Sequence, residues 1–467
     1  MAEFDYDLVV LGSGPAGHHA AIQAAKLRKR VMVAERRAIL GGICVNLGTI
    51  PSKTIRESVL YLSGYRERRI YGESYQLKEH ITLDDLRARV EPVVRHEVDV
   101  SRHQLIRNGV EIVNAEASFT GPHTLRLALP DESRQRTVSA RYIVIAVGTA
   151  VTRDPQMPRD GHLVFSSDDV MQLDELPHTL AVIGGGVIGC EYASMFAALG
   201  VRVTLIDMRP RLLPFVDAEV VRALGYHLGE NRVTLRLGEK VAAAEIIEDH
   251  GLRRVRISLA SGKQIVADKV LSAVGRMGAS ASLNLTAAGI EPDPRGRIPV
   301  NSAYRTIVPH IYAAGDIIGF PSLASTSAEQ GRLAACDAFG VTARWSPELF
   351  PYGIYTIPEI SFVGRNEEEL TAEKVPYEIG KAQYREIARG NIIGDSIGML
   401  KLLFDRATRD LLGVHIIGEG AVELVHIGQA VLAHKGKVDY FIETVFNYPT
   451  LAECYKNAAF DGINRLQ

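Results

Sequence analysis

Two glycine-rich stretches are the parts of this sequence best suited to chemistry, and they follow one plan. The first spans residues 8–36, LVVLGSGPAGHHAAIQAAKLRKRVMVAER, and the second spans residues 180–208, LAVIGGGVIGCEYASMFAALGVRVTLIDM. Each pattern predicts a strand, a tight turn, an alanine-rich helix and a second strand. The turns share the spacing G-x-G-x-x-G, formed by Gly12, Gly14 and Gly17 in one copy and by Gly184, Gly186 and Gly189 in the other.

Each copy also ends its second strand in an acidic residue, Glu35 or Asp207, 18 residues after the last glycine of its turn. In such a turn the first glycine permits the sharp bend, the second lets a pyrophosphate approach the backbone, and the third packs the helix against the strand. The helix N-terminus attracts the anion, and the acid accepts hydrogen bonds from a ribose hydroxyl. One copy alone is compatible with a turn that binds nothing. Two copies in register indicate two dinucleotide sites, for a bound FAD and for an exchangeable nicotinamide nucleotide.

Three further strand ends carry residues of similar type. The segment IYAAGDIIG, residues 311–319, leads into Gly315 and Asp316, and we expect Asp316 to hold the ribitol chain of FAD. The alternative for this residue is an ordinary helix-capping aspartate. The strands YIVIAVGT and VLSAVGRMG lead to Gly148 and Gly275, which we interpret as the points where the chain leaves the two nucleotide-binding domains.

The elements that must position these residues predict an α/β protein with two Rossmann-like dinucleotide-binding domains followed by an α+β domain. A chain of 467 residues is long enough for several domains. We place the first segment of the FAD-binding domain at residues 1–150, the NAD(P)-binding domain at 151–276, the second FAD-binding segment at 277–345 and the last domain at 346–467. The last segment is assigned to a separate domain because its strands and helices alternate without a glycine fingerprint.

Charge and cysteine content exclude several other classes of protein. The 53 basic residues balance 55 acidic residues, so the chain has no electrostatic footprint for nucleic acid. No uncharged apolar run reaches about 18 residues, and we expect no membrane contact. The start, MAEFDYDLVV, is acidic where a signal peptide is basic, and the four cysteines lie far apart, without the spacing of a disulfide framework or a zinc site. We therefore expect a cytoplasmic protein with no bound metal.

The stretch GGICVNLGTIPSKT, residues 41–54, resembles the active-site helix of the pyridine nucleotide-disulfide oxidoreductases, the family of lipoamide dehydrogenase and glutathione reductase. YTIPEISFVG at 355–364 and FNYPTLAE at 446–453 extend the resemblance over essentially the whole chain. The resemblance implies the order FAD, nicotinamide, FAD and dimer-interface segment, with one tightly bound FAD per subunit. It also implies a homodimer or a higher homo-oligomer, with residues 346–467 as the dimerisation domain.

The sequence departs from this family at the residues that reduce disulfides. Cys44 matches the first cysteine of the family's Cys-x4-Cys, whereas Thr49 occupies the place of the second. Tyr448 replaces the histidine of the C-terminal motif, although Pro449 and Glu453 remain. Disulfide reduction needs two thiols and a base, and threonine forms no disulfide while tyrosine is a poor base at neutral pH. A disulfide reductase is therefore excluded, and Cys44 is expected only to pack near the flavin.

GTIPSK together with FNYPTLAE resembles the transhydrogenase branch of the family, whose soluble members move hydride from NADPH to NAD+, reversibly, through FAD and without a redox-active disulfide. GCEYASMF, GFPSLAS and GIYTIPEIS fit that branch too. The resemblance places Lys53 near the flavin N5, paired with Glu191, as the two catalytic residues, and it adds Gly42 and Thr49 to the flavin site. Two alternatives stay open: an NAD(P)H:quinone or dye reductase, and a non-catalytic FAD-binding component of a complex.

The sequence leaves the nucleotide preference open. Asp207 suits the free 2′-hydroxyl of NAD, whereas Arg209 and Arg211 follow at once and are suited to the 2′-phosphate of NADP. Ordinary surface charge is the alternative for both arginines. We expect one site that accepts both NAD(H) and NADP(H) as exchangeable substrates.

Overall fold

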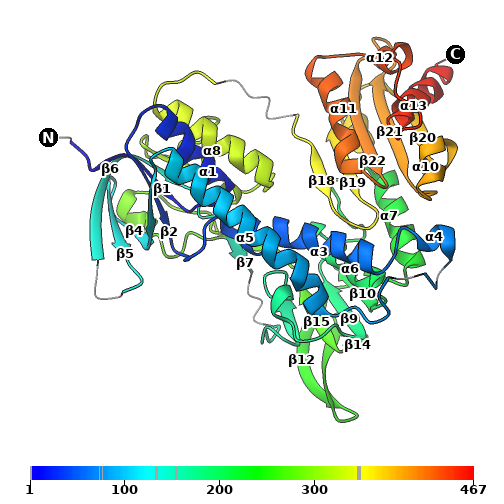
Figure 1. Cartoon of the computed structure of the whole chain (residues 1–467), viewed down its shortest axis with the longest axis horizontal. Helices are drawn as coiled ribbons and strands as arrows, with labels where there is room; N and C mark the ends of the chain where they lie inside the picture. The colour runs from blue at the N-terminus through cyan, green and yellow to red at the C-terminus, as the bar shows by residue number, and fades with distance from the viewer. Residues whose placement is uncertain are drawn as a thin grey trace. The chain divides into compact units, whose positions relative to one another are not determined.

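The computed structural model describes residues 3–72, 74–75, 77–131, 135–152, 156–343 and 349–466, and its mixed α/β fold is the predicted class (Figure 1). The chain divides into two units. The first comprises Met1–Ile55, Arg87–Arg153 and Gly275–Trp345, and the second comprises Arg56–Leu86, Asp154–Val274 and Ser346–Gln467. The boundary that we predicted between residues 345 and 346 lies outside the described residues.

A seven-stranded sheet forms the centre of the first unit. Its strands run in the order β3-β2-β1-β6-β5-β4, and β17 also pairs with β6. Because β2 and β6 flank β1, the strand order reverses at β1, and ligands of open α/β sheets bind at such a switch point. The mutually parallel strands are β1 (Tyr6–Leu11), β2 (Val31–Glu35), β3 (Glu111–Asn114), β6 (Gln135–Ile145) and β17 (Ile311–Ala313), while β4 (Glu116–Gly121) and β5 (Thr124–Ala128) pair antiparallel.

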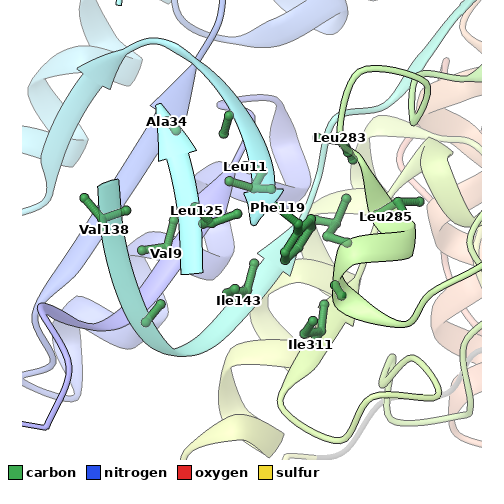
Figure 2. Close-up of a cluster of buried hydrophobic side chains, with 14 of the residues drawn as sticks. Val9, Leu11, Ala34, Phe119, Leu125, Val138, Ile143, Leu283, Leu285 and Ile311 are labelled. Carbon is green, nitrogen blue, oxygen red and sulfur yellow. The ribbon is translucent and has the colours of Figure 1, made fainter. Parts of the chain in front are cut away.

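Two helices of the first unit, α1 (Pro15–Lys26) and α8 (Ala324–Ala338), pack on this sheet. The unit also contains α2 (Gly42–Asn46), and the division between the two units falls within α3 (Thr49–Leu62) and α5 (Leu83–Arg107). Side chains of β1 alternate between two cores, as a strand buried on both faces requires. Val9 and Leu11 lie with Phe119 and Leu285 in one cluster (Figure 2), and Leu8 and Val10 lie with the alanines of α1 in the other.

The second unit contains another parallel sheet, in the order β11-β10-β9-β15-β8. The strands are β8 (Val164–Ser166), β9 (Thr179–Ile183), β10 (Arg202–Asp207), β11 (Thr234–Leu237) and β15 (Lys269–Ser272), with α6 (Val187–Ala198) and α7 (Ala218–Glu230). A separate antiparallel sheet consists of β12 (Val241–Asp249), β13 (Leu252–Leu259) and β14 (Gln264–Ala267). The repeat seen in the sequence is therefore a repeat of structure, since β9, α6 and β10 follow the plan of β1, α1 and β2.

The C-terminal part of the second unit is an antiparallel sheet in the order β18-β19-β22-β21-β20 with helices packed on it. The strands are β18 (Tyr352–Ile354), β19 (Ile360–Gly364), β20 (Tyr377–Gln383), β21 (Met399–Asp405) and β22 (Leu411–Ile417). The helices are α9 (Glu367–Ala372), α10 (Ala388–Ile392), α11 (Ala421–Ala433), α12 (Asp439–Glu443) and α13 (Glu453–Asn464). No helix of the described residues is long and apolar enough to cross a membrane.

A two-stranded ribbon closes the first unit where the chain leaves it and returns. Strands β7 (Thr149–Val151) and β16 (Arg276–Gly278) pair antiparallel, and the Thr152 backbone N–H donates to the Gly275 carbonyl at 3.1 Å. Gly148 and Gly275, both with positive φ, lie at this ribbon. Arg276 Nε donates to Thr149 Oγ1 at 2.9 Å and ties the two strands together through their side chains.

Candidate nucleotide-binding sites

The first glycine turn connects β1 to α1. Gly12 has a φ of +99°, and a Cβ at this position would lie 2.5 Å from the Ala146 carbonyl oxygen. A Cβ at Gly17 would lie 2.0 Å from the Gly12 carbonyl oxygen, so the fold itself demands both glycines. Gly14 differs, because its backbone is extended and a Cβ there would come no closer than 4.0 Å, to Gly42 Cα. Packing does not demand a glycine at Gly14, whereas close approach of a pyrophosphate does.

The second glycine turn, between β9 and α6, repeats this geometry. A Cβ at Gly184 would lie 2.4 Å from the Ala273 carbonyl oxygen, and one at Gly189 would lie 1.8 Å from the Gly184 carbonyl oxygen. A Cβ at the middle glycine, Gly186, would meet nothing within 4 Å. Neither α1 nor α6 has a side chain that caps its first turn. Both helix N-termini therefore keep backbone amides and partial positive charge available to an anionic ligand.

The acid of the first copy anchors the turn to the neighbouring strand. Glu35 is buried at the end of β2, where its Oε2 accepts hydrogen bonds from Ser13 N at 2.9 Å and from Ser13 Oγ at 2.7 Å. Its Oε1 accepts one from Arg37 N at 3.0 Å, and Ser13 Oγ also accepts one from Gly41 N at 3.0 Å. Ser13 is not among the predicted site residues, although its position between two fingerprint glycines points to such a role.

The third strand end of this site brings Asp316 toward the start of α1. Gly315 has a φ of +82°, its N–H donates to Gln330 Oε1 at 2.8 Å, and a Cβ there would lie 3.1 Å from Ala16 Cβ. Burial raises the pKa of Asp316, while the charge of Arg276 and a hydrogen bond from Ser327 Oγ at 3.4 Å oppose that rise. An enclosed carboxyl group beside the glycine turn is suited to bind ligand hydroxyls.

The segment that carries Cys44 meets the middle glycine of the first turn. Gly42 has a φ of +60°, and a Cβ there would lie 2.9 Å from Gly14 Cα. The Thr49 and Cys44 side chains are hydrogen-bonded to each other, and Thr49 stands where the sequence resemblance implies a second sulfur. Burial raises the pKa of Cys44, and the Thr49 hydrogen bond and the charge of Lys53 lower it without offsetting the rise. Cys44 is therefore a protonated, free thiol at neutral pH.

The acid of the second copy is held by an arginine. Asp207, at the end of β10, accepts hydrogen bonds from Gly185 N at 2.5 Å and, through both oxygens, from the Arg209 guanidinium, with Nε at 2.9 Å and Nη2 at 2.6 Å. Burial raises the pKa of Asp207, but the hydrogen bonds and the charge of Arg209 outweigh it and lower the pKa overall. Arg211 is bound elsewhere, with Nη1 2.9 Å from Glu368 Oε1 and Nη2 donating to the Pro214 carbonyl at 2.6 Å.

The two residues predicted to be catalytic lie in different units. Lys53 is half-buried in α3 and belongs to the first unit, whereas Glu191 is buried in α6 of the second. Glu191 Oε1 accepts a hydrogen bond from Tyr355 N at 2.9 Å, so the YTIPEIS motif fixes this carboxylate. The pairing of Lys53 with Glu191 stays a prediction.

Comparisons with known proteins cover both units. The model of the pyridine nucleotide-disulphide oxidoreductase family matches residues 6–331, and that of the family's dimerisation domain matches residues 350–459. A soluble pyridine nucleotide transhydrogenase of Mycobacterium tuberculosis is 51% identical over 463 residues, 99% of this chain and 98% of its own. One from Colwellia psychrerythraea is 43% identical over 467 residues, 99% of each chain. Among solved structures, an HOCl-induced flavoprotein disulfide reductase from Escherichia coli covers 97% of this chain and 99% of its own at 26% identity, with a TM-score of 0.87.

Proposed function

The chain belongs to the pyridine nucleotide-disulphide oxidoreductase family, and we propose that within it the protein is an FAD-dependent transhydrogenase that moves hydride from NADPH to NAD+, reversibly. Full-length likeness to soluble transhydrogenases supports this activity. We further propose that residues 1–150 and 277–345 bind FAD, that residues 151–276 bind the nicotinamide nucleotide, and that residues 346–467 form the dimer interface.

The observation that carries the proposal is the contact between Cys44 and Thr49. The relatives that reduce disulfides need two sulfurs at this place, one to attack the substrate and one to resolve the mixed disulfide. Here the neighbour of Cys44 is a hydroxyl group, and burial keeps the pKa of the thiol high. Electrons must therefore pass between nucleotides without a thiol relay.

The residues of the first unit bind and orient the flavin. Gly14 and the N-terminus of α1 receive its pyrophosphate, while Glu35 and Asp316 accept hydrogen bonds from its ribose and ribitol hydroxyls. When bound there, FAD would supply the reversible hydride acceptor between the two nicotinamides. Lys53, whose charge lies close enough to Cys44 to act on its pKa, places a cation beside this site.

The residues of the second unit bind the two nicotinamide nucleotides in turn. Gly186 and the N-terminus of α6 bind the pyrophosphate, and Asp207 and Arg209 contact the adenosine ribose. Since one site serves both nucleotides, NADP+ leaves before NAD+ enters, and positioning of the nicotinamide supplies most of the rate.

The experiment that tests this function mixes the purified protein with NADPH and thionicotinamide adenine dinucleotide, whose reduced form has its own absorption band. We expect steady formation of the reduced analogue without added thiol or disulfide. Parallel assays replace the analogue with a quinone or with lipoamide. Fast quinone reduction with little transfer to the analogue would instead identify a quinone reductase, and inactivity with every acceptor would identify a non-catalytic flavoprotein.

We also propose that the protein acts as a homodimer in the cytoplasm. The match to the dimerisation domain supports self-association. Apolar side chains of the C-terminal segment are exposed in the single chain, including Val445 at 90% and Tyr448 at 75%, and burial against a second copy would remove them from water. Sedimentation at micromolar concentration should give twice the chain mass, and an active monomer would contradict the proposal.

A further inference from the structure

The acids of the two nucleotide sites, Glu35 and Asp207, differ in how many of their hydrogen-bond acceptor positions are already used by the protein. A carboxylate has about four acceptor positions. Glu35 accepts three hydrogen bonds from Ser13 and Arg37 N, which leaves one position for a ribose hydroxyl. Asp207 accepts four, from Gly185 N, Arg209 N, Arg209 Nε and Arg209 Nη2. Asp207 therefore has no acceptor position left for a ribose while the Arg209 side chain is in place.

Comparison of the two copies of the repeat shows which group uses the additional acceptor positions of Asp207. Arg37 and Arg209 both stand two residues after their acid, and both donate their backbone N–H to it. Only Arg209 adds its guanidinium. Its side chain is 43% exposed, whereas that of Asp207 is 3% exposed. The arginine thus lies over a buried carboxylate with part of its own surface in water.

The exposed part of Arg209 keeps donors for a ligand. A guanidinium has five N–H donors, of which Nε and one of Nη2 are used on Asp207. Nη1 makes no hydrogen bond to any residue that the structure describes. Arg211 is less suited, since both of its amino groups are engaged by Glu368 and Pro214. The Asp207–Arg209 pair therefore presents one open cationic edge, which matches a phosphate.

We propose that Asp207 and Arg209 form a switch through which a single site accepts both nucleotides, a proposal that rests on the transhydrogenase function above. In the closed state Arg209 neutralises Asp207 and offers its Nη1 edge to the 2′-phosphate of NADP(H). In the open state the arginine turns into solvent, and Asp207 accepts hydrogen bonds from the ribose hydroxyls of NAD(H). NAD(H) must break the ion pair to bind, whereas NADP(H) uses it.

Two adenosine fragments test the switch on the FAD-loaded protein. AMP and adenosine 2′,5′-bisphosphate differ only in the 2′-phosphate, and calorimetry measures their binding without any hydride transfer. Arg209→Ala should weaken the bisphosphate at least tenfold, since a charge-assisted contact is lost. It should also tighten AMP about two- to fivefold, the range of a half-exposed ion pair that no longer has to be broken.

Two further variants separate the switch from a general effect of charge. Asp207→Asn should weaken AMP and leave the bisphosphate bound at least as tightly, because the acceptor is lost together with a repelling charge. Arg202→Ala removes the same charge from the exposed start of β10, at the other end of the strand, and should not change the ratio of the two affinities.

Several outcomes would overturn the switch. It is wrong if Arg209→Ala weakens both fragments equally, if the AMP affinity stays the same or falls, or if the wild-type protein binds neither fragment. Failure of the proposed function looks different, because hydride transfer would then be absent from the wild-type protein while the affinity ratio still shifts with Arg209. If hydride transfer is intact and Arg209→Ala does not change the ratio of the two fragment affinities, only the switch is wrong.

Discussion

Lys401 and Asp217 form an ion pair that is closed off from solvent, with Lys401 Nζ 2.9 Å from Oδ2 and 3.0 Å from Oδ1. The two side chains are 0% and 1% exposed. Glu219 and Glu367 also contact the ammonium, and oxygens of these three acids lie within 4.8 Å of one another. The lysine supplies the positive charge that such a cluster requires, and it joins β21 to the first turn of α7.

Replacing this lysine should destabilise the second unit strongly. Lys401→Met leaves the buried carboxylate of Asp217 without its cation, and we expect the free energy of unfolding to fall by about 3–5 kcal/mol. Urea denaturation followed by circular dichroism measures the loss. Lys381→Met is the matched control, because Lys381 pairs with Glu219 at 2.9 Å but is 31% exposed, and its loss should cost about 1 kcal/mol or less. Equal losses would show that enclosure of the Lys401 pair adds nothing.

The protein should lose stability as the pH decreases, because of His415. This histidine is buried beside Asp217 and Lys401, its Nε2 lies 2.9 Å from the Arg365 carbonyl oxygen, and its Nδ1 has no hydrogen-bond partner. Burial lowers its pKa, although Asp217 and the Arg365 carbonyl oppose that shift. The His415 side chain therefore binds a proton near pH 6.5 in the unfolded chain but not in the native state. The free energy of unfolding decreases as the pH falls below that value.

One proton corresponds to a slope of up to about 1.4 kcal/mol per pH unit. His415→Gln should reduce the slope of unfolding free energy between about pH 7 and pH 5 by that amount, measured by denaturant titration at each pH. His18 and His310, whose pKa values burial also lowers, contribute in both proteins and cancel in the comparison. Identical slopes would mean that His415 takes up its proton in the native state.

The glycines of the first turn should separate folding from flavin binding. Gly14→Ala brings a Cβ no closer than 4.0 Å to its nearest neighbour, Gly42 Cα, so the flavin-free protein should fold with nearly wild-type stability but bind FAD poorly. Gly17→Ala forces a Cβ to 2.0 Å from a carbonyl oxygen and should prevent folding of the first unit. The flavin-to-protein ratio and the melting temperature of the flavin-free form distinguish the two. A fully yellow Gly14→Ala protein would show that no pyrophosphate approaches this residue.

Hydride transfer should not depend on Cys44. Cys44→Ser is expected to keep NADPH-to-NAD+ transfer within a few-fold, because a protonated thiol beside a hydroxyl carries no electrons. Reduction of the wild-type protein by NADPH should give no long-wavelength charge-transfer band. Thr49→Cys restores the second sulfur and should introduce that band. Loss of transfer in Cys44→Ser with FAD retained would require a thiol relay.

Lys53 should matter much more than Cys44. Lys53→Ala is expected to lower kcat at least tenfold, equivalent to about 1.4 kcal/mol of barrier, by removing a cation beside the flavin. A double-mutant cycle with Glu191→Gln tests the predicted pairing, since the effects of paired residues are not additive. Additive losses, with the FAD content unchanged, would show that the two residues act separately.

The sequence predicts the repeated turns well because each glycine fingerprint lies within a few consecutive residues. Gly17 and Gly189 are required by carbonyl groups of their own turns, whereas Gly12 and Gly184 approach carbonyl groups that directly follow the distant strands β6 and β15. Glu35 and Asp207 end their strands as expected. The contact of the Arg209 side chain with Asp207 cannot be predicted from the sequence, because an arginine two residues after an acid can equally extend into solvent. Arg37, at the same distance from Glu35, contacts that acid through its backbone N–H. The ion pair of Lys401 cannot be predicted from the sequence either, since only folding brings this lysine to Asp217. The division of the chain inside α3 and α5 has no signature in periodicity.

The ribbon of β7 and β16 bears on how such a protein is assembled in evolution. Because Thr152 and Gly275 are hydrogen-bonded to each other, everything between them leaves and re-enters the first unit at one point. We infer that a module inserted between these two residues would leave the register of the first sheet unchanged. The two similar glycine turns are what a duplicated module inserted at such a point would leave behind.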